Sequence, residues 1–442
     1  MMALVVVIAL LPARPLSLRE AVDIAVAADP GVSQRTIDEE RARLQLLRAN
    51  LERIHASVDV TVQELYAKPN LFGPLAPGCE KASDVGCDPS PNVILGLSNV
   101  EARVDAPLFS GWRVEADIAR AEHLGAAARL DIDVERAAVA VAVARAYWGE
   151  RRLALLQDAQ VASVERLAES ERIVQARVKA GLAPGIDTNR AAARRVQLDV
   201  DRLALHSQQR EAHVRLVSLL GIDGPVELSD AASPLAAPED EQVLITRALE
   251  ARPELRAAQL RISALDEEKR SAESAFWPQL GAGLLVQLGN NPSVAGAGNR
   301  AVGADAFPFS GLVGDVQAGV SVSMNLFDTW ATSQAVDDVG HRQRRAAADV
   351  RALVRELETN VRLARAEVVS LQEQREGLER ARALVGDNAT ILQRAYERGE
   401  VVVTELLDAQ LELFDADRRL VDVDARLALA RIELARAVGE ER

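Results

Sequence analysis

The sequence predicts a mainly α-helical protein that also carries membrane β-strands and is built from one structural unit that occurs twice. Three observations support this fold class. Long segments keep apolar residues at helical spacing, four short segments alternate apolar and polar residues, and matching motifs recur along the chain. Aromatic residues make up only 3% of the chain, which suits long helices packed side by side better than one large globular core.

A signal peptide is expected at residues 1–15. The apolar run from Ala3 to Leu11 is too short to cross a bilayer, but it has the length of a signal-peptide core. No run of about 18 apolar residues follows, so no membrane-spanning helix is expected. The net charge is −14, with acids and bases interspersed along helical segments, so nucleic acid is not expected as a partner.

Two structural repeats are expected after this segment. The motif APLFSGW, ending at Trp112, matches MNLFDTW, ending at Trp330. The segment ARVKAGLAPGIDTNRA, which contains Gly181, matches RAYERGEVVVTELLDAQ, which contains Gly399. Each repeat is therefore expected to run helix, strand, loop, strand, long helix, tight turn and helix. The expected boundaries are 16–221 for the first repeat, 222–240 for a linker and 241–439 for the second repeat.

Four strands are expected from the alternation of apolar and polar residues. They span about 56–66 and 93–107 in the first repeat and about 279–289 and 313–326 in the second. One face would carry only aliphatic residues and the other polar residues and glycine, which is typical of a sheet between lipid and water. Two ordinary hairpins packed on a soluble core are the alternative. Because an open sheet edge in lipid is too costly, four membrane strands would require several chains to share one barrel.

Long helices are expected at 112–180 and 330–398, which contain no proline and would each be about 100 Å long. Apolar residues of the second helix recur every seven residues, which predicts a coiled-coil seam. They are Val350, Leu357, Ala364, Leu371 and Leu378. The helical segments 18–54 and 186–220 are together about as long as one long helix. Each long helix is therefore expected to run beside two shorter helices stacked end to end.

The two cysteines, Cys79 and Cys87, lie in the Pro- and Gly-rich stretch PNLFGPLAPGCEKASDVGCDPSP. In a loop of an exported protein this spacing predicts a local disulfide, because a metal site would need ligands that the loop does not offer. His206 and His213, seven residues apart on one expected helix, leave a metal site open as a minor alternative. The sequence contains no phosphate-binding loop and no nucleophile with a matching base, so no cofactor and no catalytic residue are expected.

These motifs resemble the TolC-like outer membrane factors, also called outer membrane efflux proteins. The resemblance runs from Leu16 to Gly439. It rests on the paired openings LSLREAVDIAVAADPGV and VLITRALEARPEL, the motifs PLFSGW and NLFDTW, and the turns VKAGLAPGIDTNRA and ERGEVVVTELLDAQ. It implies a homotrimer with a twelve-stranded barrel in the outer membrane, continuous with a long α-helical barrel in the periplasm.

The resemblance implies a passive outer-membrane exit duct of a tripartite efflux pump or type I secretion system, moving substrate to the cell exterior. The expected partners are two further copies of the chain, a periplasmic membrane fusion (adaptor) protein, an inner-membrane pump of the RND or ABC type, and outer-membrane lipid. An enzyme is not expected. The alternative is a soluble periplasmic coiled-coil adaptor or scaffold, which would leave the alternating strands unexplained.

The resemblance also assigns residues near the periplasmic tip. Glu405 and Asp408 lie three residues apart on one helix face, and with Asp187 they would form a periplasmic constriction in a threefold channel. Two solvated acids near a helix start are the alternative. Asp187 and Tyr396 occupy latch positions, so a hydrogen bond between them is expected in the closed state.

Gly181 and Gly399 are expected to allow tight turns between helices and to contact the adaptor. The sequence departs from the family pattern at Val401, where a basic latch residue can occur, and at Ile186, where a hydroxyl can occur. One link of the closed state is therefore expected to be missing.

Overall fold

The computed structural model describes residues 15–67, 93–222, 224, 226–229, 240–289, 313–324 and 329–440. The expected signal peptide up to residue 14, the Cys79–Cys87 pair and most of the 222–240 linker lie outside the described residues. The chain forms two compact units, each with residues from both structural repeats. The first unit is Met1–Glu40, Ala126–Gln259 and Ala347–Arg442, and the second is Arg41–Gly125 and Leu260–Ala346.

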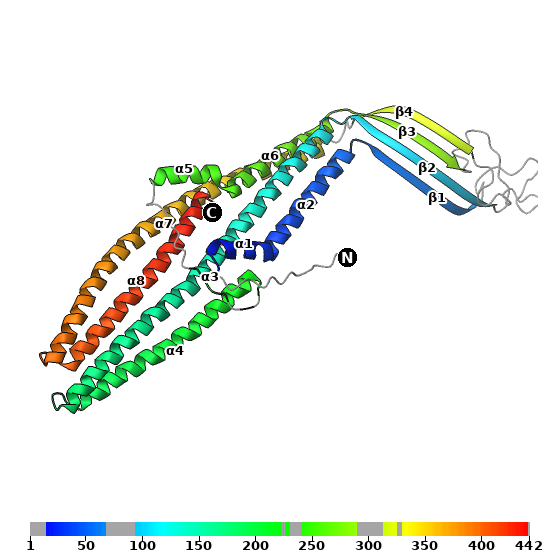
Figure 1. Ribbon diagram of the computed structural model, residues 1–442. Helices are drawn as coiled ribbons and strands as arrows, with labels where there is room; N and C mark the ends of the chain where they lie inside the picture. Colours follow the sequence, from blue (N-terminus) through cyan, green and yellow to red (C-terminus); the bar gives the residue numbers. More distant parts are fainter. Residues whose placement is uncertain are drawn as a thin grey trace, which may run out of the picture. The chain divides into compact units, whose positions relative to one another are not determined.

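The predicted fold class is confirmed, because the described elements are mainly helices with four strands (Figure 1). In chain order they are α1 (Leu18–Ala28), α2 (Pro30–Leu51), β1 (His55–Ala67), β2 (Val93–Phe109), α3 (Arg113–Lys179), α4 (Ile186–Leu220), α5 (Glu241–Ala251), α6 (Pro253–Glu273), the short 3₁₀ helix η1 (Ser274–Phe276), β3 (Gln279–Gly289), β4 (Val313–Ser323), α7 (Thr329–Arg398) and α8 (Val403–Val438).

The single helix expected over 18–54 is two helices, and this expectation was wrong. Proline lacks the backbone N–H that a helix interior requires, so α1 ends before Pro30, and Pro30 starts α2. The Asp29 carboxylate accepts a hydrogen bond from the backbone N–H of Val32 at 2.9 Å and thereby caps the new helix. The second repeat has the same break, since α6 begins at Pro253.

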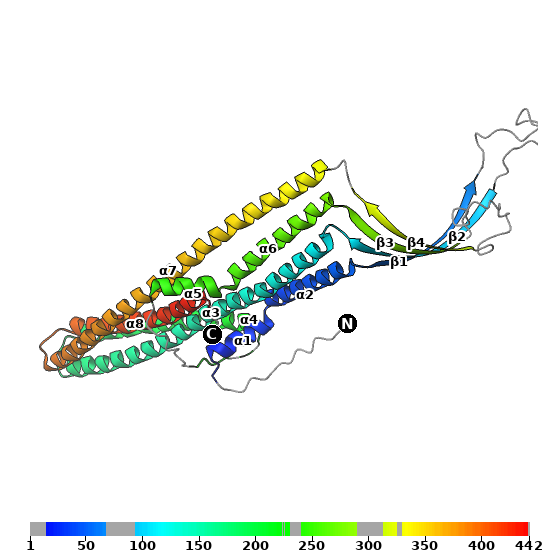
Figure 2. The same cartoon turned by 90° about the horizontal axis from the view of Figure 1, so that it is seen from above.

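The first unit is a bundle in which α3 packs beside α4 and α7 packs beside α8 (Figures 1 and 2). The predicted seam on α7 is confirmed, because Leu371 and its neighbour Val368 are buried against α8. Ion pairs join α3 to α8, with 2.6 Å between Arg152 Nη1 and Asp422 Oδ1. The helix α8 therefore contacts α3, and it also pairs with α4 through Asp408 and Arg194.

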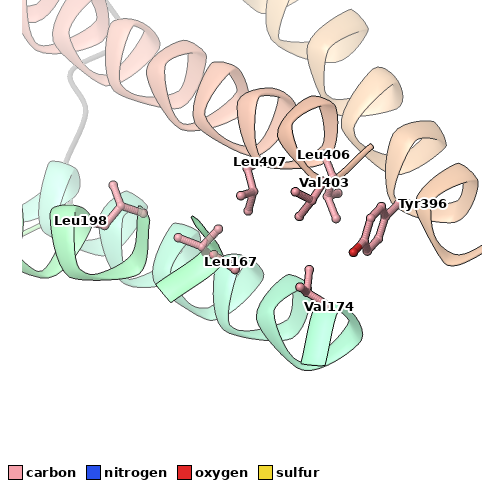
Figure 3. Close-up of a cluster of buried hydrophobic side chains, with 8 residues drawn as sticks. Leu167, Val174, Leu198, Tyr396, Val403, Leu406 and Leu407 are labelled. Carbon is pink, nitrogen blue, oxygen red and sulfur yellow. The ribbon is translucent and has the colours of Figure 1, made fainter. Parts of the chain in front are cut away.

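One end of this bundle is held by an apolar cluster to which all four helices contribute (Figure 3). Side chains of α3 and α4 point toward those of α7 and α8, and the eight buried members are at most 3% exposed. They are Leu167, Val174, Ala191, Leu198, Tyr396, Val403, Leu406 and Leu407. Burial of a Leu or Val side chain contributes about 1.5–3 kcal/mol, so this cluster stabilises the turns that lie beyond it.

The second unit contains an antiparallel sheet in the order β1-β2-β3-β4. The register places Val60 opposite Val100, Val104 opposite Leu284, and Val286 opposite Val316. The described positions on this face are therefore Ala, Val or Leu, apart from Gly314 opposite Leu288 and Phe109 opposite Leu280, and none of them is buried. The polar face carries a cross-strand hydrogen bond from Gln287 Nε2 to Glu101 Oε2 at 3.0 Å. The predicted apolar and polar faces are confirmed where the side chains are described.

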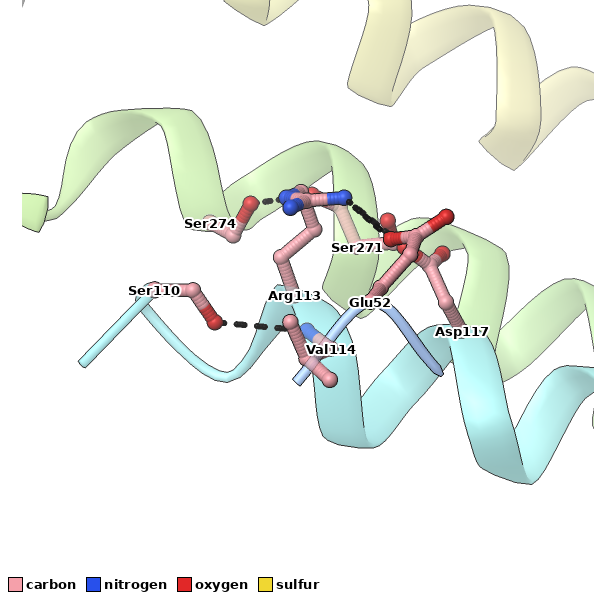
Figure 4. A network of polar contacts seen from close by, with 7 residues as sticks. All are labelled: Glu52, Ser110, Arg113, Val114, Asp117, Ser271 and Ser274. Atoms are coloured by element: carbon pink, nitrogen blue, oxygen red, sulfur yellow. Dashed lines mark hydrogen bonds and ion pairs between the residues drawn. The ribbon is translucent and has the colours of Figure 1, made fainter. Parts of the chain in front are cut away.

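The strand β2 passes into α3 through a bend at Gly111 and Trp112, whose φ angles are 64° and 65°. Ser110 Oγ accepts a hydrogen bond from the backbone N–H of Val114 at 3.3 Å, and Arg113 Nη1 contacts Glu52 Oε2 at 3.0 Å (Figure 4). The Trp112 ring meets those of Phe109 and Trp277 edge to face. A Cβ on Gly111 would lie 2.7 Å from the Ser274 carbonyl oxygen, so only glycine fits this bend.

We predict that Gly111→Ala destabilises the folded protein by about 2–4 kcal/mol, because it combines a left-handed backbone with a steric clash. The control is Gly125→Ala within α3, where a Cβ would meet no atom within 4 Å. This control is expected to be neutral or stabilising by about 0.5–1 kcal/mol. Thermal unfolding followed by circular dichroism measures both variants. Equal melting temperatures would mean that the bend does not need glycine.

Candidate functional site at the helical turns

The two turns between long helices are closed by the same backbone motif. Gly181 and Gly399 have φ angles of 74° and 85°, which glycine adopts without steric cost. After α3, the Leu182 N–H donates to the Arg177 carbonyl at 2.9 Å, and after α7 the Glu400 N–H donates to the Ala395 carbonyl at 2.9 Å. These bonds satisfy carbonyl groups that a helix end leaves free, as in a Schellman motif. The predicted role of both glycines in tight turns is confirmed, whereas their contact with an adaptor remains a proposal.

The predicted latch residues lie close together but are not joined by a hydrogen bond. The Tyr396 side chain is 2% exposed, and its hydroxyl is buried without a hydrogen-bond partner in the described chain. Asp187 is also buried and instead accepts a hydrogen bond from Arg190 Nη1 at 3.4 Å. Burial raises the pKa of Tyr396, and the nearby Asp187 carboxylate raises it further, while Arg177 opposes the shift. The expected hydrogen bond between Tyr396 and Asp187 is therefore absent from this chain.

The predicted constriction acids are exposed on the first turns of α8. Asp408 Oδ1 lies 3.4 Å from Arg194 Nη2, in a pair whose side chains are 61% and 49% exposed. Glu405 has no ion-pair partner among the described residues. Two further exposed acids, Glu412 and Asp415, continue the same helix face at spacings of three and four residues. The sequence analysis missed this extension, although the helical spacing alone indicates it.

Arg177 is a further residue that the sequence analysis missed. It lies in the last turn of α3, and its Nη1 donates to the carbonyl oxygens of Tyr396 and Glu397, both at 2.7 Å. Its Nη2 donates to the Leu182 carbonyl oxygen at 3.3 Å. A basic residue near a helix C-terminus is a known partner for free carbonyls, so the sequence held a signal for this contact on α3 but not for the bonds to α7.

The two departures from the family pattern have different surroundings. Val401 packs against the apolar cluster below the turns, whereas Ile186 is 57% exposed. Neither Val401 nor Ile186 can supply the charge or the hydroxyl group that the family pattern can place at these positions. An apolar residue at position 401 therefore extends the cluster instead of providing an ion pair.

The described residues contain no group of three or more His, Cys, Asp or Glu side chains that could hold a metal ion. His213 Nδ1 lies 2.9 Å from Glu150 Oε1, so this histidine pairs with α3 and not with His206. No described helix is both long and apolar enough to cross a bilayer.

Comparison with known proteins found one family model that matches part of the chain. Residues 244–440 match the family model described as outer membrane efflux protein. The second half of the chain therefore resembles the outer membrane efflux protein family, and the predicted resemblance is confirmed. Comparison with curated proteins gave no match.

Solved structures extend the same fold over nearly the whole chain. A membrane protein from Pseudomonas aeruginosa is 20% identical to this chain, with a TM-score of 0.77. The match covers 96% of this chain and 93% of that protein's chain. CusC is 16% identical with a TM-score of 0.77, covering 96% and 92%. VceC from Vibrio cholerae is 16% identical with a TM-score of 0.74, covering 96% of both chains. Together with the family match, these structures support the predicted exit duct and not the alternative of a soluble adaptor or scaffold.

We predict that Tyr396→Phe leaves stability at pH 7 unchanged or raises it by up to about 1 kcal/mol, because it removes a buried hydroxyl that has no partner. The control is Tyr147→Phe, since the equally buried Tyr147 hydroxyl lies 3.0 Å from the carbonyl oxygens of Leu16 and Ser229 and can donate its proton to either. This control should cost about 1–2 kcal/mol. Destabilisation by the Tyr396 variant would indicate a hydrogen bond to Asp187.

Tyr396→Phe also tests how the stability of the protein depends on pH. The folded state holds the Tyr396 proton more tightly than the unfolded state, because its pKa is raised above the ordinary value of 10.0. This contribution of Tyr396 to stability is fully present below about pH 10 and is lost as the pH rises through the folded-state pKa of Tyr396. Unfolding measured between about pH 9 and pH 12 should therefore show a steeper loss of stability in the wild type than in Tyr396→Phe.

Proposed function

We propose that the protein is a passive outer-membrane exit duct that works as a homotrimer with a periplasmic adaptor and an inner-membrane pump. The observation that carries this proposal is the four-stranded sheet, which has a continuous apolar face and free edges at β1 and β4. Lipid can cover that face, but it cannot satisfy the backbone groups of an open edge. Joining β4 of one copy to β1 of the next closes the sheet into a twelve-stranded barrel.

Exposed residues on α4 and α7 support a ring of copies in a second, independent way. On α4, exposed positions that are apolar or small recur every seven residues, and α7 has a matching series. They are Ile186, Ala193, Val200, Ser207 and Val214 on α4, and Leu363, Ser370, Gly377, Leu384 and Ile391 on α7. A seven-residue repeat is the spacing of a coiled-coil seam, so α4 of one copy fits against α7 of the next. The contact is head to tail, which generates a closed ring.

The acids on α8 give the channel its constriction. In a threefold ring Glu405 and Asp408 each occur three times, and Asp187 lies at the matching turn of the first repeat. An exposed ion pair such as Asp408 with Arg194 is worth at most about 1 kcal/mol, so it weakens the charge of this ring only in part. Rings of carboxylates favour cations and disfavour anions.

The adaptor contact is assigned to the turns that contain Gly181 and Gly399. Each turn carries an exposed apolar residue, Leu182 at 67% and Val402 at 61% exposure. Exposed apolar side chains on a rigid turn suit contact with another protein. Transport itself takes its energy from the pump, of the RND or ABC type, to which the adaptor connects the duct.

We predict that the wild type sediments with the outer membrane and has the mass of a trimer in detergent. Val200→Asp should dissociate the trimer to monomers, because it places a charge in the α4 seam of all three interfaces. Leu384→Asp on α7 should act in the same way, whereas Gln208→Asp, at an exposed polar position of α4, should leave the trimer intact. Light scattering measures each mass. A soluble wild-type monomer would overturn the proposed function.

We predict that replacing both Glu405 and Asp408 by Ala raises single-channel conductance or weakens block by divalent cations in planar bilayers. Removing the carboxylates widens the constriction and lowers the local cation concentration. The control is Asp337→Ala, which removes an exposed acid near the start of α7. Unchanged conductance together with unchanged block in the double variant would place the constriction elsewhere.

A further inference from the structure

Arg177 connects the two turns of the tip through backbone carbonyls. Its guanidinium donates to Tyr396 and Glu397 at the end of α7, and also to Leu182 in the turn that follows its own helix. The guanidinium carbon lies 5.1 Å from the centre of the Tyr396 ring. One side chain of α3 therefore contacts both turns and the residue at the predicted latch position.

The charge of Arg177 suits this position. The last carbonyl groups of α3 and α7 are the negative ends of two helix dipoles, and a cation there is stabilising. The planar guanidinium can donate several hydrogen bonds at once, which a lysine ammonium cannot do in the same geometry. The bonds go to backbone oxygens and not to a carboxylate, so they persist when neighbouring acids are protonated.

The space beside Gly399 is fitted to this guanidinium. A Cβ added to Gly399 would lie 2.9 Å from Arg177 Nη2. Glycine is therefore required at position 399 for two reasons, the left-handed φ angle of 85° and the space that the guanidinium occupies. At Gly181 a Cβ would meet no atom within 4 Å, so only the α7 turn is shaped around a side chain of another helix.

We propose that Arg177 is the positioning residue of the gate, holding the α7–α8 turn against α3 in the closed state. This proposal rests on the proposed channel function. Movement of the α7–α8 turn away from α3 must break two hydrogen bonds of 2.7 Å and the contact with the Tyr396 ring. Arg177 thereby supplies a link within one chain, where Val401 provides no basic latch residue.

The test uses Arg177→Gln and Arg177→Lys in the full-length protein, with Arg172→Gln as control. Arg172 lies on the same helix and forms an exposed ion pair with Glu169, also on α3. Hydrogen exchange of residues 395–402 measures the turn directly, and single-channel recording in planar bilayers measures the gate. Arg177→Lys keeps the positive charge, so the test can still be read if Arg177→Gln fails to fold.

We expect Arg177→Gln to accelerate exchange in the α7–α8 turn at least tenfold and to increase the open fraction, with Arg177→Lys intermediate and Arg172→Gln unchanged. Faster exchange with unaltered channel opening would overturn the gating role and leave a structural contact. Unchanged hydrogen exchange would show that Arg177 does not hold the α7–α8 turn against α3. If the wild type forms no channel but Arg177→Gln still accelerates exchange, the proposed function is contradicted, whereas the role of Arg177 in holding the turn is not.

Discussion

The backbone hydrogen bonds that a sheet edge leaves unmade are the constraint on which the rest of the structure depends. β1 and β4 are the edges of a sheet whose one face carries mainly Ala, Val and Leu and no polar side chain at the described positions. In lipid each unpaired N–H or carbonyl costs several kcal/mol. In the proposed assembly, a ring of copies pairs these edges, and the exposed seams on α4 and α7 fit the same ring.

The helical bundle separates two kinds of contact along its length. Apolar contacts such as Val368 with Val423 are buried within one chain, while the seam around Val200 on α4 is left exposed. Ion pairs such as Arg152 with Asp422 set the order of the helices but contribute little stability individually. Stability thus comes mainly from the buried seams, and the proposed assembly uses the exposed ones.

At the tip, the residues expected to form the latch make other contacts. Tyr396 and Asp187 lie near each other, yet the phenol has no hydrogen-bond partner. Its ring instead packs in the apolar cluster and under the Arg177 guanidinium. The contacts between these turns therefore pass through backbone carbonyls and packing, while Glu405 and Asp408 are exposed on α8.

The sequence by itself determined the duplicated architecture, the two faces of the sheet, the buried seam of α7 and the glycine turns. These features follow from local periodicity and from backbone preferences of single residues. Only the tertiary structure decided which tip residues touch. Arg177 and Tyr396 are far apart in sequence and meet through the packing of α3 against α7, and the same packing leaves the Tyr396 hydroxyl out of reach of Asp187. Such contacts depend on side-chain geometry across helices, which sequence spacing does not encode.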